Sequence, residues 1–204
     1  MGTDKTDRAQ PRGGPFRQRR GWRTVDIVVA AVIGVAVGVV FWIWGVVWEA
    51  TAPLFIAFPP AQAVLYGIWL LPGVLGGLVI RRPGAAVLTS IAASSVSALL
   101  GSQWGITVVL DGFFQGLLPE LVFLAFLYRR WGVVVSVLAA AAAGLFPAVR
   151  DNIVHYAAWP LHFQVVYGVI VVASAAGIAG VGARLLTTAL ARAGALAPFP
   201  SARG

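Results

Sequence analysis

Long apolar segments recur along the chain, separated by short stretches that contain charged, Gly and Pro residues. Six of these segments are expected, over residues 25–47, 61–80, 84–100, 111–128 with an approach from 106, a stretch from near 132, and 163–186. About 20 residues at ~1.5 Å rise per residue cross the ~30 Å hydrocarbon core of a bilayer. The pattern therefore predicts an all-α membrane protein with six transmembrane helices.

Basic segments flank this apolar region on both sides. We expect an N-terminal tail over residues 1–23, a transmembrane domain over 24–192 and a C-terminal tail over 193–204. A cleavable signal peptide is the alternative at the N-terminus. The apolar run over 25–47 is too long for a signal peptide, however, and it ends without an A-x-A cleavage site.

Composition and charge support a membrane protein. Hydrophobic residues make up 59% of the chain and charged residues 11%, against about 25% charged residues in soluble domains. The net charge of +8 could indicate nucleic acid, but seven of the fifteen Lys and Arg residues fall within the first 23 positions. By the positive-inside rule all of them except Arg150 lie on one side. We therefore expect both termini in the cytoplasm, a place in the bacterial plasma membrane, a basic tail able to contact anionic lipid, and no nucleic-acid partner.

Residue types that hold metals are scarce. The chain has no Cys, two His and seven acidic residues. Disulfides and thiolate metal sites are thereby excluded. No metal or other cofactor is expected, and little remains from which to build a metal-dependent enzyme.

The fourth apolar segment contains an unusual group of polar features. Gln115, Pro119 and Glu120 lie near the middle of residues 111–128. A carboxylate at that depth costs at least ~2.5 kcal/mol unless it faces a wet or paired interior. Pro119 donates no hydrogen bond, so the carbonyl of Gln115 lacks its helical partner. We predict a ligand site anchored by Glu120; the alternative is a polar bond to a Ser or Thr across a helix interface, with Glu120 in a structural role.

Small residues at Ala30, Gly34 and Gly38 repeat every four positions in the first apolar segment. This spacing places them on one stripe of a helix, where another helix can approach closely. Packing within this protein and docking of a separate membrane subunit are both compatible with the stripe.

Further polar residues follow the fifth apolar segment. Asn152 and His155 share one face at helical spacing, and a helix-capping or loop-packing role is the alternative to ligand binding. Asp26 and Asp111 are interpreted as cap or interface residues.

Several short motifs occur in order along the middle of the chain. They are Tyr66-Gly67-Ile68-Trp69, residues 80–86 (IRRPGAA), Leu100-Gly101, Gln115-Gly116-Leu117, Glu120, and residues 122–125 (VFLA). The chain resembles the YkoE-type substrate-binding (S) component of energy-coupling factor (ECF) transporters. The motifs match over residues 66–125, and the number and topology of the spans match over residues 25–190. In the fifth and sixth segments the correspondence is limited to residues 156–158.

The resemblance implies a six-helix membrane protein that captures thiamine or its hydroxymethylpyrimidine precursor from outside the cell. It further implies docking on a transmembrane coupling subunit and two cytoplasmic ATPases, with Ala30, Gly34 and Gly38 at the coupling subunit. Gly stands where the family pattern has Ala at two of these positions. The chain has no G-x-x-x-x-G-K-[ST] motif, so ATP hydrolysis would be the work of partners.

Thiamine, if it is the ligand, requires a carboxylate for its thiazolium cation and aromatic faces for its rings. Tyr66 and Trp69 are expected to supply those faces, since aromatic rings bind cations. Gln115 can bond a pyrimidine edge. The remaining candidates for the site are Asn152, His155 and Trp48.

Two other functions compete with vitamin capture. A membrane-integral enzyme could use Glu120 as an acid or base, but the sequence offers only His155 as a second catalytic group. A ligand-free assembly subunit would use Glu120 structurally.

Overall fold

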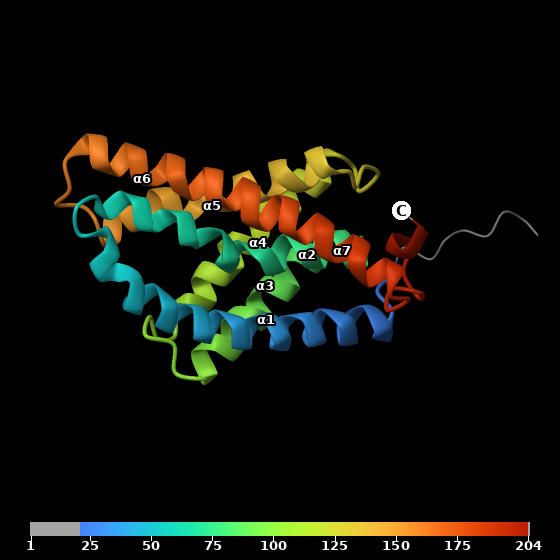
Figure 1. Cartoon of the computed structure of the whole chain (residues 1–204). Coiled ribbons are helices and arrows are strands. Elements are labelled where there is room, and N and C mark those ends of the chain that lie inside the picture. The colour runs from blue at the N-terminus through green and yellow to red at the C-terminus, as the bar shows by residue number, and fades with distance from the viewer. Residues whose placement is uncertain (1–20, 204) are drawn as a thin grey trace, which may run out of the picture.

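The computed structural model describes residues 21–203 (Figure 1). The predicted basic tail and its expected lipid contact lie outside this range, apart from residues 21–23. The described part is helical and has no strand. Its elements are α1 (Thr24–Thr51), η1 (Ala52–Phe55), η2 (Pro59–Leu70), α2 (Leu71–Ile80), α3 (Ala85–Leu99), α4 (Thr107–Ala125), α5 (Val133–Val154), α6 (Leu161–Ser174), η3 (Ala175–Val181), α7 (Gly182–Arg192) and η4 (Pro200–Arg203).

Five helical stretches are long and apolar enough to cross a membrane. They are Thr24–Phe55, Pro59–Ile80, Thr107–Ala125, Val133–Val154 and Leu161–Arg192. The sixth apolar helix, α3, has 15 residues and is about 22 Å long at ~1.5 Å per residue. It packs against both α1 and α4. The described chain is therefore an all-α, multi-pass membrane protein, as the apolar pattern predicted.

The start of α1 and the C-terminal residues meet at one end of the bundle (Figure 1). The guanidinium of Arg23 donates to the carbonyl oxygen of Pro198 at 3.2 Å and lies over the ring of Phe199. Asp26 accepts hydrogen bonds from the backbone and guanidinium of Arg23 and pairs with Arg82 at 3.3 Å. Asp26 thus caps α1, as predicted. Because both described chain ends lie at the same end of the bundle, an even number of spans joins them.

The second span is made of two helix types. It begins at Pro59 as a 3-10 helix and becomes α-helical at Leu71, close to the predicted range of 61–80. In a 3-10 helix, side chains at i and i+3 eclipse one another. Tyr66 and Trp69 therefore point from one side of η2.

Residues 72–80 of α2 are all buried, at the centre of the bundle (Figure 1). Glycines allow its neighbours to approach closely. A Cβ on Gly73 would lie 2.8 Å from Oγ of Ser90, on α3. This helix is the apolar axis around which the other helices pack.

The small-residue stripe of α1 faces the interior of this chain. Ala30, Gly34 and Gly38 are buried, and a Cβ on Gly38 would lie 2.6 Å from the carbonyl oxygen of Ala93 on α3. The prediction that the stripe docks a separate subunit is therefore wrong, because α3 already occupies it. The opposite face of α1, which includes Val32, is exposed.

The last span runs without a break from Leu161 to Arg192, with a π-helical segment at Ala175–Val181. It is longer at both ends than the predicted 163–186. The residues that follow pack back on the bundle. Phe199 is buried, and the hydroxyl of Ser201 donates to the carbonyl oxygen of Val79 at 2.8 Å.

Candidate functional site

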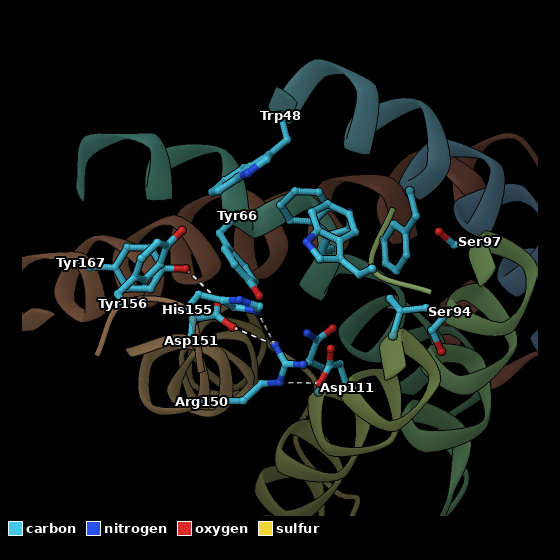
Figure 2. Close-up of a pocket in the computed structure, with 15 residues that line it drawn as sticks. Trp48, Tyr66, Ser94, Ser97, Asp111, Arg150, Asp151, His155, Tyr156 and Tyr167 are labelled. Atoms are coloured by element: carbon cyan, nitrogen blue, oxygen red, sulfur yellow. Dashed lines mark hydrogen bonds and ion pairs between the residues drawn. The ribbon is translucent and has the colours of Figure 1, made fainter. Parts of the chain in front are cut away.

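A cavity of about 220 Å³ lies near the end of the bundle opposite to the two chain ends. It is formed by the C-terminal half of α1, η2, α3, the loop before α4, α4, the end of α5 and α6. Its lining residues are Phe41, Trp48, Tyr66, Trp69, Ser94, Ser97, Trp104, Val108, Asp111, Gln115, Arg150, Asp151, His155, Tyr156 and Tyr167. Figure 2 shows these side chains converging from all of these elements.

One part of the cavity wall is aromatic. The ring centroid of Trp69 lies 5.2 Å from that of Trp48, 5.3 Å from that of Tyr66 and 5.1 Å from that of Trp104. These tilted and edge-on contacts are the favoured geometries for aromatic pairs. The cluster presents flat apolar faces to any molecule that enters the cavity.

A charged group forms another part of the wall (Figure 2). Nε of Arg150 lies 2.9 Å from Oδ1 of Asp111, and its Nη1 lies 3.2 Å from Oδ1 of Asp151. The two carboxylates come from different helices, α4 and α5. One guanidinium therefore joins both helices through the cavity.

Neighbouring side chains hold this charged group in place. The hydroxyl of Tyr167, on α6, donates to Oδ2 of Asp151 at 2.7 Å. Nη1 of Arg150 lies 3.1 Å from Nε2 of His155. Because a guanidinium has only donors, Nε2 of His155 is the acceptor in this contact. Burial, with Asp151 nearby, raises the pKa of Tyr156 to about 12, so its phenol is protonated at neutral pH.

Acidic side chains outnumber basic ones in the lining, so its formal charge is negative. Asp111 and Asp151 contribute two negative charges, and Arg150 contributes one positive charge. A partly enclosed cavity with one unbalanced carboxylate attracts a cation, because Coulomb interactions strengthen as water is excluded. The arrangement suits a ligand that combines a flat ring with a positive charge.

Five of the seven predicted ligand residues line the cavity. They are Trp48, Tyr66, Trp69, Gln115 and His155. Gln115 lies one helical turn after Asp111 on α4, so both side chains project from the same face.

Glu120 does not line the cavity, contrary to the prediction that it anchors the ligand. Its Oε1 accepts a hydrogen bond from the backbone N–H of Gly84 at 2.7 Å, and its Oε2 accepts one from Ala86 at 2.9 Å. The hydroxyl of Tyr128 also donates to Oε1. A helix N-terminus has unpaired N–H groups and a partial positive charge. Glu120 on α4 therefore caps α3, near the chain ends and away from the cavity.

Asn152 is also outside the cavity lining. Its Nδ2 donates to the carbonyl oxygens of Ala148 at 2.8 Å and Gln164 at 3.0 Å. It shared a predicted face with His155, but α5 ends at Val154 and the chain turns there. Asn152 therefore ties α5 to α6, the loop-packing role that was the alternative for this residue.

Several residues of the charged group were not predicted from the sequence. Asp111 had been interpreted as a cap or interface residue, Arg150 had served only as a topology marker, and Asp151 and Tyr167 had no assigned role. A usable signal was present. Arg150 is the one basic residue that the positive-inside rule leaves unexplained, and Asp151 is adjacent to it.

Three comparisons with known proteins identify the family. The family described as "ABC-type cobalt transport system, permease component" matches residues 25–146. The chain is 32% identical over 178 residues to "Putative HMP/thiamine permease protein YkoE" of Bacillus subtilis (strain 168), which covers 87% of this chain and 88% of that protein. It also matches a crystal structure of an S-component of an ECF transporter with a TM-score of 0.84 and 31% identity, over 90% of this chain and 92% of that one. This chain therefore belongs to the family of ECF transporter S components, which are multi-pass proteins of the cell membrane that serve transport and are not enzymes.

Proposed function

We propose that this chain captures thiamine or its hydroxymethylpyrimidine precursor from outside the cell for ATP-driven import. One observation supports this most strongly. The cavity joins an aromatic wall to a charged group with one carboxylate in excess. The Bacillus subtilis relative, named as an HMP/thiamine permease, agrees with this chemistry.

Thiamine has two parts that fit the two parts of the lining. Its thiazolium carries a fixed positive charge, which Asp111 and Asp151 would balance together with Arg150. Its aminopyrimidine is flat and would lie against Trp69 and the neighbouring rings. Gln115 has two donors and one acceptor for the polar edge of the pyrimidine. The precursor lacks the thiazolium, so it would depend on the aromatic wall and Gln115.

The family description names cobalt, which is the second ligand to consider. The atoms that would bind a metal in this cavity are the carboxylates of Asp111 and Asp151 and Nε2 of His155. All three groups already contact the guanidinium of Arg150. A metal ion would have to displace that guanidinium, whereas an organic cation can lie beside it. The arrangement therefore favours the organic ligand.

Import would require partners. The sequence has no nucleotide-binding motif of its own, so a transmembrane coupling subunit and two cytoplasmic ATPases would supply ATP hydrolysis. Because α3 covers Ala30, Gly34 and Gly38, we expect these partners to dock elsewhere on this chain.

Tryptophan fluorescence tests this proposal on the detergent-solubilised full chain. Trp48, Trp69 and Trp104 line the cavity, so thiamine should change the emission in a saturable way. Hydroxymethylpyrimidine should compete with thiamine, and Co²⁺ should not. Mass spectrometry of the purified protein should find one of the two organic compounds bound. Saturable binding of Co²⁺ without binding of either organic compound would contradict the proposal.

A further inference from the structure

We propose that this cavity rejects phosphate esters of its ligand, and that Asp111 and Asp151 impose the rejection. The inference rests on the proposed function, because thiamine and hydroxymethylpyrimidine are the compounds whose phosphate esters are compared. It adds a selectivity that neither the fold nor the relatives specify. Its basis is the way in which the single guanidinium of the lining is surrounded.

Arg150 is the only Lys or Arg among the lining residues. A phosphate is bound tightly in a protein when it accepts hydrogen bonds from a guanidinium, with N to O distances of about 2.7–2.9 Å. In this cavity Nε of Arg150 is directed at Asp111 and Nη1 at Asp151, at 2.9 and 3.2 Å. Two of the three guanidinium nitrogens are therefore already engaged by carboxylates.

The carboxylate of Asp151 is not free to make way for a phosphate. Asp151 is buried, and Tyr167, itself 1% exposed, donates to its second oxygen at 2.7 Å. His155 also accepts from Arg150 through Nε2. The three groups that the guanidinium contacts, the carboxylates of Asp111 and Asp151 and Nε2 of His155, are thus acceptors that compete with a phosphate for its N–H groups.

The net charge of the lining also disfavours binding of a phosphate ester. A phosphate monoester carries a charge of about −1.5 to −2 at pH 7, so phosphorylation changes thiamine from a cation into a net anion. At their formal charges, Asp111, Asp151 and Arg150 already sum to one negative charge. A like charge placed in a water-poor site is a strong device for excluding a wrong ligand. The unphosphorylated compounds meet no such repulsion.

This selectivity would place a reaction before capture. A phosphate ester of either compound would not be taken up directly. Hydrolysis of the phosphate monoester, with water as the co-reactant and inorganic phosphate as the product, would have to precede binding.

The experiment compares four compounds on the full detergent-solubilised chain. Thiamine, thiamine monophosphate, hydroxymethylpyrimidine and its phosphate are titrated by tryptophan fluorescence or calorimetry. In the parent protein each ester should bind at least about 100-fold more weakly than its alcohol, a difference of ~2.7 kcal/mol. In Asp111→Asn and Asp151→Asn the ratio between thiamine and its monophosphate should shrink by about tenfold or more.

Glu49→Gln is the matched control. It removes the same unit of charge from an exposed carboxylate outside the lining, which Gln103 contacts at 3.0 Å. The ratio should stay within about twofold of the parent value, because exposed charges are screened. Equal binding of thiamine and its monophosphate by the parent protein would overturn the proposed rejection of phosphate esters while leaving the proposed function intact. If neither the unphosphorylated compounds nor their phosphate esters bind, both the proposed function and the proposed rejection of phosphate esters are wrong.

Discussion

Arg150 on α5 and Asp111 on α4 form an ion pair through the cavity, with 2.9 Å between Nε and Oδ1. The pair brings charge into a space whose other wall is made of tryptophan and tyrosine rings (Figure 2). A buried or half-buried pair of this kind is weak evidence for stability, because desolvation offsets the attraction. Its position in the cavity supports a role in binding ligand.

Trp69→Ala should weaken thiamine binding. Trp69 is the ring that contacts three other aromatic residues of the lining, and a cation over an aromatic face gains about 0.5–2 kcal/mol. We expect a loss of affinity of that size in a calorimetric titration. Trp42→Ala is the control, since Trp42 is 42% exposed on α1 and is not in the lining. A larger loss from Trp42→Ala than from Trp69→Ala would contradict the aromatic wall.

Gly34→Leu should destabilise the protein itself. A side chain at this position would meet Ala92 of α3, and overpacking of this kind costs about 1–3 kcal/mol. We expect a lower melting temperature and reduced ligand binding together. Val35→Leu, on the exposed face of α1, should leave both unchanged. Normal melting of Gly34→Leu with a loss of transport alone would instead support docking of a partner at this stripe.

Asn152→Ala should lower stability without changing ligand affinity. The substitution removes the hydrogen bonds to Ala148 and Gln164 that join α5 to α6, each worth about 1 kcal/mol. Thermal unfolding should report this loss, while the Kd for thiamine should stay within about threefold. His155→Ala provides the contrast, because it removes an acceptor of Arg150 inside the cavity. If Asn152→Ala weakened binding as much as His155→Ala, Asn152 would belong to the site.

The orientation in the membrane stays a prediction from the distribution of basic residues. A reporter fused after Gly204 should be active only on the cytoplasmic side, because fourteen of the fifteen Lys and Arg residues are assigned to that side by the positive-inside rule. Fusion after Trp159, in the connection between α5 and α6 near the cavity, should give the opposite result. A reporter active only outside when fused after Gly204 would reverse the assignment.

The spans could be predicted from the sequence because apolar length is a local property of the chain. The starts of the second and the last span were each found to within two residues for this reason, whereas the last span ends six residues later than predicted, at Arg192. Packing partners are not local. The spacing of Ala30, Gly34 and Gly38 is compatible with a neighbouring helix of this chain or of a partner protein. Only the fold shows that the neighbour is α3.

The error over Glu120 has a specific physical origin. The apolar pattern predicts a span over residues 111–128, with an approach from 106, and so places Glu120 near its middle. The helix in fact runs from Thr107 to Ala125, so Asp111 lies a full turn inside it and Glu120 lies near its end. Glu120 is nevertheless buried there, and the backbone N–H groups of Gly84 and Ala86 supply the partners that its carboxylate needs. The cost of a buried acid was a sound argument, but the group that offsets it is the N-terminus of α3 and not a ligand.

Paired thiamine titrations of Asp111→Asn and Glu120→Gln test the central claim most directly. If the site is the cavity at Arg150, Asp111→Asn should weaken binding by roughly 1.5–3 kcal/mol, the range for a hydrogen bond to a charged group, which is about ten- to a hundredfold or more in Kd. Glu120→Gln should lower the melting temperature, because it removes the carboxylate that caps α3, while the folded protein keeps its Kd within about threefold. The reverse result, with Glu120→Gln abolishing binding and Asp111→Asn leaving it unchanged, would contradict this account.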